Sequence, residues 1–256
     1  AIVGAGPGGL HTAKWSADRG LKVILIEKRK DISKITRYCS EHIILDEDYN
    51  GDTVKVDIER NKIVSTVNGW EVEYKGELCP VTDKYYYSPS GYTIHFAWPD
   101  KRPFAYKFDK GLLLQTLLEE CLKMGVIYQN ETTAYDAVDS SDGVEIKCVR
   151  KGEKSKLKAK KLVIADGSIT QMGQAMGFNS DRSYMGNARC LATYMSGVKD
   201  YKPSEWILWY GRCYGSNLAP IMGTGPAGHF DDWADMIILG SHKDPPDKVL
   251  EYFIKK

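Results

Sequence analysis

The first 28 residues combine a strand pattern, a glycine-rich turn, a helix pattern and a second strand pattern. Residues 1–3 are apolar and lead into the turn. Leu10 and Ala17 share one face of the following helix, and Gly20 is a typical residue for a helix end. Residues 21–28 are again mostly apolar and end in an acidic and a basic residue. This order predicts a βαβ unit with a parallel sheet.

The rest of the chain predicts many short strands and few helices. Residues 54–104 alternate apolar and polar positions, as half-buried strands do, and residues 108–124 form an amphipathic helix. Further strands are expected at 126–129, 132–138, 143–150 and 155–165. Residues 183–240 return to strand-like aromatic sequence, and a short helix is expected from Asp247.

The glycine-rich turn has the residues that a dinucleotide site needs. Gly4 allows the tight turn, Gly6 lets a pyrophosphate approach the backbone, and Gly9 lets the helix pack closely on the strand. The helix N-terminus then offers unpaired N–H groups to the phosphates. Glu27, 18 residues after Gly9, can accept hydrogen bonds from both ribose hydroxyls and repels a 2′-phosphate. The motif therefore predicts an adenosine half like that of FAD or NAD.

Composition and charge exclude several other classes. The chain has 256 residues, of which 43% are hydrophobic, so it is too apolar to be disordered. Thirty-five basic and 34 acidic residues leave a formal charge of +1, which argues against a nucleic-acid partner. No aliphatic run approaches the length of a membrane span, and the six cysteines and five histidines show no metal-ligand spacing. We expect a cytoplasmic protein with no bound metal and at most peripheral membrane contact.

Four motifs resemble those of one flavoprotein family. The stretch from Arg37 to Ile43 contains Arg37, Cys39 and Glu41 and resembles the Arg-x-Cys-x-Glu stretch of the geranylgeranyl reductases. These reductases belong to the wider group built like para-hydroxybenzoate hydroxylase. The other similar segments, in chain order, are the Phe-Asp-x-x-Leu helix at 108–113, the apolar strand ending in Asp166-Gly167, and the segment 234–240.

The resemblance implies a fold and a domain organisation. The fold class is α/β, with an FAD/NAD(P)-binding Rossmann-type domain like that of glutathione reductase and a mostly antiparallel β-sheet substrate domain. The FAD-binding domain would be discontinuous and comprise residues 1–53 and 105–182. Residues 54–104 and 183–256 would form the substrate domain.

The resemblance also implies the cofactor, FAD, and its site. In the similar reductases the Cys stretch passes the flavin ring, so Cys39 is a candidate catalytic residue. A small, inert, buried thiol is the alternative reading of Cys39, and a turn at a strand end is the alternative reading of Asp166. The candidate cofactor-binding residues are Gly4, Gly6, Gly8, Gly9, Glu27, Lys28, Arg37, Cys39, Ser40, Ala134, Asp166 and Gly167.

The activity that the resemblance implies is reduction of carbon–carbon double bonds in a polyprenyl substrate by reduced FAD. The substrate would be an apolar small molecule or lipid, and the electron donor NAD(P)H or a ferredoxin-like protein. Two alternatives remain open: an FAD-dependent monooxygenase of the same fold, and a catalytically silent dinucleotide-binding fragment. The family's Gly-Asp motif, which contacts FAD after the substrate sheet, is not found before Lys256. We therefore expect a longer flavoprotein of which this chain is a part.

Three further segments have simpler interpretations. A second glycine triplet, Gly223 to Gly228, lacks a following helix and an acidic strand end, so we expect a loop there. The basic run 150–161 alternates lysines as a solvated edge strand does. The aromatic clusters are typical of strand packing, and some of them would line an apolar tunnel if the resemblance holds.

Overall fold

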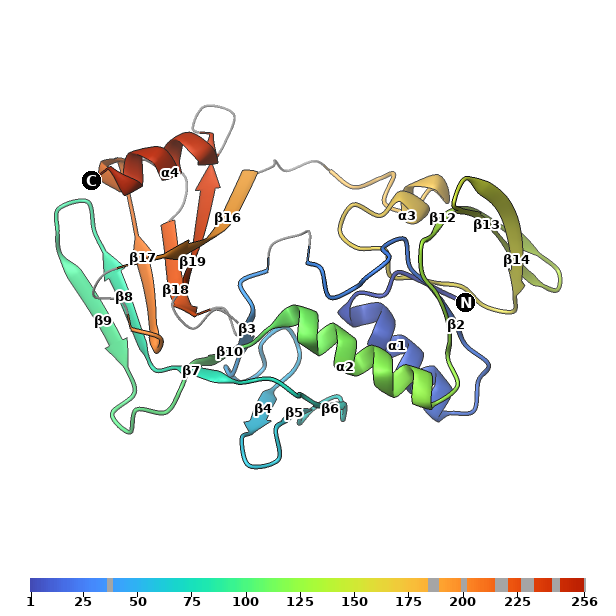
Figure 1. The fold of residues 1–256 in the computed structure, drawn as a ribbon, viewed down its shortest axis with the longest axis horizontal. Coiled ribbons are helices and arrows are strands. Elements are labelled where there is room, and N and C mark those ends of the chain that lie inside the picture. Colours follow the sequence, from blue (N-terminus) through green and yellow to red (C-terminus); the bar gives the residue numbers. More distant parts are fainter. Residues whose placement is uncertain are drawn as a thin grey trace. The chain divides into compact units, whose positions relative to one another are not determined.

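The structure is a computed structural model, and it describes residues 1–35, 39–183, 189–198, 202–214, 221–226, 233–240 and 245–255. The chain forms two compact units, each built from two segments (Figure 1). The first unit comprises Ala1–Ile35 and Gly111–Tyr184, and the second comprises Thr36–Lys110 and Met185–Lys256. The predicted domains have the same interleaved order, and their boundaries stay a prediction.

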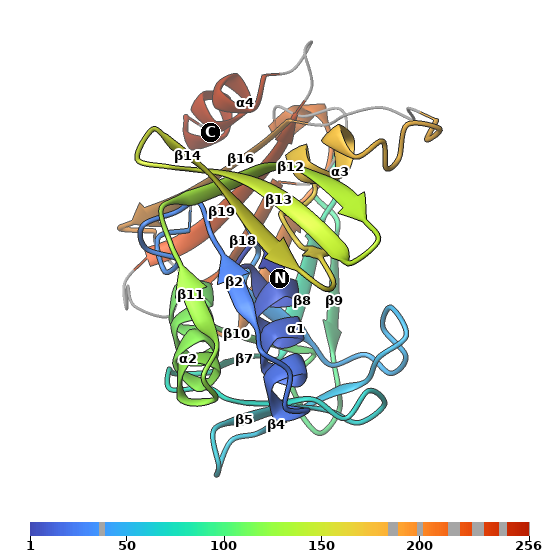
Figure 2. The ribbon, with the colours of Figure 1, turned by 90° about the vertical axis from the view of Figure 1, so that its right-hand side faces the viewer.

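The first unit contains a parallel four-stranded sheet in the order β11-β2-β1-β15. Its strands are β1 (Ile2–Val3), β2 (Ile24–Ile26), β11 (Ile127–Gln129) and β15 (Val163–Ile164). Helix α1 (Pro7–Asp18) connects β1 to β2, and α2 (Lys110–Lys123) precedes β11. Figure 2 shows β2 and β11 side by side next to the two helices. The helices are joined by a Lys14–Glu120 ion pair of 2.6 Å and by the Cys121 thiol, which donates to the Leu10 carbonyl.

An antiparallel sheet of three strands completes this unit together with a short helix. The strands are β12 (Thr132–Ser140), β13 (Gly143–Arg150) and β14 (Glu153–Ala159), and the helix is α3 (Gln171–Ala175). Side chains from both sheets and from α3 share one core, which contains Val3, Ile26, Ile146 and Met172. The basic run lies on β14, which pairs with β13 alone and is the edge strand that its lysine pattern predicted.

The predicted single strand 155–165 is wrong, because the structure divides it between two sheets. β14 ends at Ala159 in the antiparallel sheet, and β15 begins at Val163 beside β1. Each half finds its hydrogen-bond partners in a different layer, so the chain must leave one sheet before it enters the other. The carbonyl of Lys161, between the two strands, accepts a hydrogen bond from the N-terminal amine of Ala1.

The second unit is built around a six-stranded mixed sheet in the order β16-β19-β18-β17-β8-β9. All neighbours are antiparallel except β17 and β8, which run parallel. Helix α4 (Pro246–Ile254) packs its Val249 and Phe253 side chains against Met236 and Ile238 of this sheet. The strands are β8 (Asp83–Tyr87), β9 (Thr93–Ala97), β16 (Arg189–Ser196), β17 (Glu205–Trp209), β18 (Ile221–Pro226) and β19 (Trp233–Gly240).

Two small antiparallel sheets lie in the same unit. One has the order β3-β10-β7 and the other the order β4-β5-β6. A 3-10 helix (Arg212–Tyr214) follows β17. The six strands are β3 (His42–Ile44), β4 (Val54–Asp57), β5 (Lys62–Ser65), β6 (Glu71–Glu73), β7 (Cys79–Val81) and β10 (Ala105–Lys107).

The fold class predicted from the sequence is confirmed, with one error in the second unit. Residues 223–228 were expected to lie in a loop, but 223–226 belong to β18, an inner strand between β17 and β19, and 227–228 lie outside the described residues. The expectation was wrong because the absence of a nucleotide site does not imply the absence of a strand. Gly223 pairs with Ile207 on one side and with Met236 on the other, so neighbouring strands hold this glycine-rich segment extended.

Candidate functional site

The glycine-rich turn after β1 is too crowded for any side chain at two positions. Gly4 has φ +100°, and a Cβ atom there would lie 2.3 Å from the Ala165 carbonyl oxygen. A Cβ atom at Gly9 would lie 1.8 Å from the Gly4 carbonyl oxygen. These distances are far below van der Waals contact, so β1, α1 and the end of β15 approach each other closely only with glycine at both positions.

The opposite side of the same turn is open. A Cβ atom at Gly6 or Gly8 would meet nothing within 4 Å. Gly6 is the N-cap of α1 and makes no side-chain cap, the first turn of α1 contains no acidic residue, and Pro7 follows directly. The first-turn N–H groups and the positive end of the helix dipole therefore have no capping side chain. This donor set fits the pyrophosphate of a dinucleotide.

Glu27, directly after β2, is buried beside this turn. Its Oε2 accepts a hydrogen bond of 2.8 Å from the Ala5 N–H, and its Oε1 accepts from the Arg29 N–H and Nε at 2.9 and 3.0 Å. Burial alone would raise the pKa of Glu27, but the hydrogen bonds from Arg29 and Ala5 and the charge of Arg29 together lower it. Glu27 is therefore an ionised carboxylate that points toward the glycine turn.

Arg29 is a residue of this site that sequence reasoning missed. Its guanidinium also donates to the Ile32 carbonyl at 3.1 Å and to Glu27 Oε2 at 3.3 Å. Because Arg29 partly neutralises Glu27, the carboxylate repels a 2′-phosphate less than the sequence argument assumed. The sequence offered one indication of this pairing, which is that Arg29 lies only two residues after Glu27. The ribose contact of Glu27 stays a prediction.

Asp166 and Gly167 lie on the other side of β1, after β15. Asp166 Oδ2 accepts a hydrogen bond of 3.0 Å from the Met172 N–H at the start of α3. The second oxygen, Oδ1, is buried and has no hydrogen-bond partner among the described residues. Gly167 has φ +98°, a conformation that favours glycine. A buried acceptor oxygen that is left without a donor fits a ligand hydroxyl or N–H group.

The remaining candidate residues have varied environments. Lys28 is exposed, and Ala134 is buried in the core of the first unit, where it pairs with Cys148 on β13. Cys39 and Ser40 are half-buried residues of the second unit, and Cys39 carries a free thiol. Arg37 lies outside the described residues. The structure thus brings Gly4, Gly6, Gly8, Gly9, Glu27, Asp166 and Gly167 into one unit, and the binding role of every candidate stays a prediction.

His42, next to the Cys39 segment, was not expected from the sequence. Neither ring nitrogen has a hydrogen-bond partner of good geometry among the described residues, and the ring stacks on Trp206 with centroids 4.9 Å apart. Burial, with the nearby charges of Lys107 and Lys84, lowers the pKa of His42 to about 3. It is therefore a neutral imidazole at physiological pH. Its partners come from β17 and β10, far away in the sequence, so no local pattern could indicate its environment.

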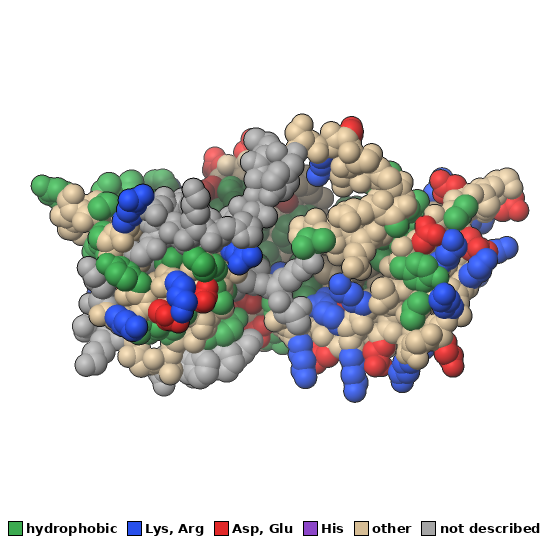
Figure 3. Space-filling model, turned by 90° about the horizontal axis from the view of Figure 1, so that it is seen from above, with side chains coloured by type: hydrophobic (Ala, Val, Ile, Leu, Met, Phe, Trp, Pro, Cys, Tyr) green, Lys and Arg blue, Asp and Glu red, His purple; other side chains and the backbone are tan. Residues whose placement is uncertain are grey.

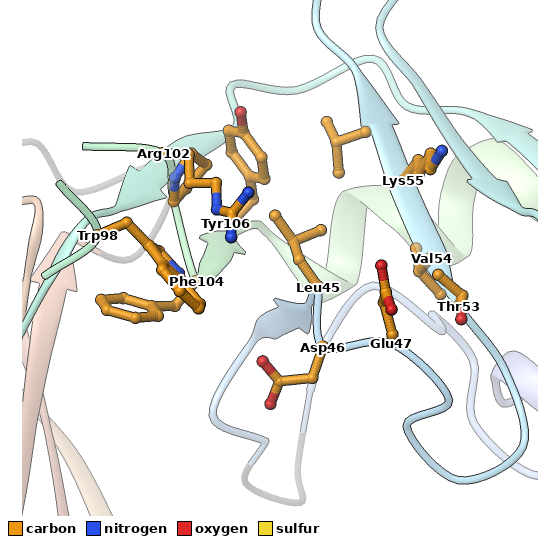
Figure 4. Close-up of a pocket in the computed structure, with 12 residues that line it drawn as sticks. Leu45, Asp46, Glu47, Thr53, Val54, Lys55, Trp98, Arg102, Phe104 and Tyr106 are labelled. Atoms are coloured by element: carbon orange, nitrogen blue, oxygen red, sulfur yellow. The ribbon is translucent and has the colours of Figure 1, made fainter. Parts of the chain in front are cut away.

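A pocket of about 670 Å³ lies in the second unit. Figure 4 shows Trp98 and Phe104 on one side of it and the β4 residues Val54 and Lys55 on the other, with Tyr106 between them. The Arg102 guanidinium lies 4.2 Å from the centre of the Trp98 ring. Aromatic walls with a few charged groups are typical of sites for small molecules.

The described part of the chain contains no cluster of three or more metal-ligating side chains. None of its helices is long and apolar enough to cross a membrane. Figure 3 shows Lys and Arg side chains mixed with Asp and Glu side chains over the upper face of the first unit. This mixture agrees with the balanced net charge.

Comparisons with known proteins match this architecture. Residues 1–193 match the family described as pyridine nucleotide-disulphide oxidoreductase. A digeranylgeranylglycerophospholipid reductase from Methanosarcina acetivorans is 27% identical over 265 residues, which cover 100% of this chain and 59% of the relative. The chain therefore spans about three-fifths of the length of this relative. The resemblance to geranylgeranyl reductases that the motifs indicated is confirmed.

Solved structures share the fold. A geranylgeranyl bacteriochlorophyll reductase-like protein from Thermoplasma acidophilum aligns with a TM-score of 0.75 and 21% identity, over 99% of this chain and 59% of that one. A p-nitrophenol 4-monooxygenase from Pseudomonas putida aligns with a TM-score of 0.65 and 14% identity, over 98% and 61%. The glycine turn and the family match, which covers most of the chain, lead to one conclusion: this chain belongs to the pyridine nucleotide-disulphide oxidoreductase family.

Proposed function

We propose that this chain is part of an FAD-dependent reductase that saturates carbon–carbon double bonds in the isoprenoid chains of a lipid. One observation carries the cofactor assignment: the turn after β1 is closed to side chains at Gly4 and Gly9 but open at Gly6 and Gly8, beside an uncapped helix N-terminus. The relatives named as reductases of a geranylgeranyl phospholipid support the substrate class.

Residues of the first unit would hold the adenosine and pyrophosphate parts of the cofactor. The first-turn N–H groups of α1 donate to the phosphates, and Gly6 and Gly8 leave room for them. Glu27 accepts from the ribose, sharing its oxygens with Ala5 and Arg29. Asp166 Oδ1 accepts from the cofactor and gains the donor that it otherwise lacks. Bound FAD would supply the hydride transfer, and its reduction would need an electron donor such as NAD(P)H or a ferredoxin-like protein.

Residues of the second unit would position the substrate. Cys39 and Ser40 are the candidates next to the flavin, with Cys39 as the candidate catalytic residue. Because an alkene has no group to anchor by hydrogen bonds, the protein must orient it by apolar contacts and exclude water. The substrate is an apolar lipid, and the protein is cytoplasmic with at most peripheral membrane contact.

The visible spectrum of the purified full-length protein, measured after unbound FAD has been removed, tests this proposal. We expect the two absorption bands of a protein-bound flavin, and anaerobic addition of a geranylgeranyl phospholipid to the reduced protein should restore the oxidised spectrum. The Gly6→Asp variant places a carboxylate at the phosphates, so it should lose FAD while it keeps its circular dichroism. Failure of the full-length wild-type protein to retain FAD would contradict the proposal.

Oxygen consumption separates the proposal from its alternatives. A reductase turns over anaerobically, whereas a monooxygenase consumes oxygen in proportion to its product. Oxygen-dependent product would therefore favour the hydroxylase alternative. Bound FAD without any turnover would favour a catalytically silent dinucleotide-binding chain.

A further inference from the structure

Strand β9 exposes an unusual row of large apolar side chains. Tyr92, Ile94, Phe96 and Trp98 are exposed to 77%, 58%, 53% and 41%. Ile94 and Phe96 belong to β9, and Tyr92 and Trp98 flank it, so the four side chains alternate along one extended segment and share one face. β9 is also an edge strand of the six-stranded sheet. We call these four residues the β9 stripe. A contiguous exposed apolar patch of this kind typically marks an interaction surface.

The stripe continues onto the neighbouring strands. In the sheet register, Ile94 lies opposite Tyr86, and Phe96 lies opposite Lys84. The Tyr86 ring contacts the Phe96 ring edge-on at 5.7 Å and stacks on Tyr210 at 6.2 Å. Cross-strand partners point to the same side of a sheet, so the stripe is the outer part of a wider aromatic face.

Two cations lie against the aromatic rings of this face. The Lys84 ammonium lies 4.9 Å from the Phe104 ring centre and 4.6 Å from the Trp206 ring centre, and the Arg102 guanidinium lies over Trp98. The acidic residues of β8 and β17, Asp83 and Glu205, are one residue out of step with Lys84 and Trp206 and therefore point to the opposite side. Asp46, on the segment after β3, is the acid whose charge reaches Lys84.

This combination fits the interface of a membrane. Ile94 and Phe96, which have no polar side-chain atoms, lie in the middle of the stripe, and the amphipathic rings of Tyr92 and Trp98 lie at its ends. Tyr and Trp prefer the headgroup level of a bilayer, and cations beside them attract anionic headgroups.

We infer that the β9 stripe and its neighbours dock on the surface of a bilayer that contains anionic lipid. The inference rests on the proposed function, because an enzyme that reduces membrane lipids must reach them in the bilayer. The pocket of the second unit adjoins the β9 stripe, because Trp98 of the stripe and its neighbours Arg102 and Phe104 line the pocket. A lipid that leaves the bilayer at the stripe would therefore meet this pocket first.

Cosedimentation with vesicles tests the inference. The FAD-loaded chain is mixed with vesicles of phosphatidylcholine, with and without phosphatidylglycerol, at low and high salt. We expect binding that is stronger with phosphatidylglycerol and weaker at high salt. Ile94→Ser and Phe96→Ser should each reduce the partition coefficient by about tenfold. Arg102→Gln should reduce binding by about fivefold on vesicles with phosphatidylglycerol and leave binding to phosphatidylcholine unchanged.

Ile127→Ser is the matched control, since Ile127 is 61% exposed on β11, an edge strand of the first unit. It should bind like the wild type, and near-ultraviolet circular dichroism confirms that each variant is folded. The inference is overturned if wild type binds neither vesicle, if folded Ile94→Ser and Phe96→Ser bind like wild type, or if Phe96→Ser dissociates a dimer in solution. Turnover of a detergent-dispersed substrate without vesicle binding would contradict the docking inference and leave the proposed function intact. Vesicle binding through the β9 stripe without flavin binding would contradict the proposed function and leave the docking inference intact.

Discussion

In the turn after β1, Gly9 has no room for an added methyl group, whereas Gly6 has. We expect Gly9→Ala to lower the free energy of unfolding by about 3 kcal/mol or more, because its Cβ atom would collide with the Gly4 carbonyl. Gly6→Ala meets no protein atom and has an ordinary extended backbone, so unfolding should change by less than about 0.5 kcal/mol. Thermal unfolding of both variants measures the difference.

The same pair tests the nucleotide assignment. If the pyrophosphate approaches the backbone at Gly6, the alanine variant should bind FAD at least about tenfold more weakly while its melting temperature stays unchanged. Flavin fluorescence titration gives the affinity. Unchanged FAD affinity in Gly6→Ala would place the phosphates elsewhere.

Glu27 makes stability depend on acid pH. Its pKa in the folded chain is lowered, so its contribution is fully present above its ordinary value of 4.5 and is lost as the pH falls through the lowered pKa. Glu27→Gln removes the charge beside Arg29 and should cost about 1–3 kcal/mol at pH 7. Urea unfolding between pH 7 and pH 3 should show a smaller loss for the variant than for wild type. Parallel curves would contradict this role.

The Asp83 carboxylate on β8 links this strand to β9 and to the segment that follows β9. Asp83 Oδ1 lies 2.7 Å from His95 Nε2 and 3.0 Å from Lys101 Nζ. Burial alone would raise the pKa of Asp83, but hydrogen bonds from Thr82, Lys101 and His95 lower it to about 2. The contribution of this group is therefore present above about pH 3.8 and is lost as the pH falls toward 2.

We expect Asp83→Asn to loosen β9 without unfolding the chain. Amides of residues 93–97 should exchange with deuterium about fivefold faster at neutral pH, because His95 and Lys101 lose the carboxylate that they share. Amides of β12 and β13, in the other unit, are the internal control and should not change. Uniform acceleration in both units would indicate global destabilisation instead.

For the whole molecule, hydrogen exchange with and without FAD separates the candidate residues that the structure leaves untested. Ligand binding slows the opening of the segments that the ligand contacts. We expect protection at the glycine turn, at residues 27–29 and around Asp166. Protection of Cys39 and Ser40 would support their place at the flavin, and its absence would assign both residues to another role.

Some helices and strands could be predicted from the local pattern of apolar and polar residues, and others could not. The helices at 110–123 and 246–254 and most strands follow from periodicity and turn residues. The division of 155–165 between β14 and β15 was missed, although the first half alternates polar and apolar residues and the second half, from Leu162 to Ala165, is continuously apolar. β18 is held by two neighbouring strands, and its glycines carry no strand signal of their own.

The nucleotide motif could be read from the chain because its parts are close in sequence. The turn, the helix and the acidic strand end lie within the first 27 residues, and local spacing specifies their geometry. The pairing of Glu27 with Arg29, the stacking of His42 on Trp206 and the common face of Phe96, Lys84 and Trp206 arise from folded contacts. Except for the Glu27 pair, these contacts join residues far apart in the chain, and loop closure and sheet register decide them. Local order thus specifies the dinucleotide-binding turn, whereas strand pairing decides which distant side chains share one face of the sheet.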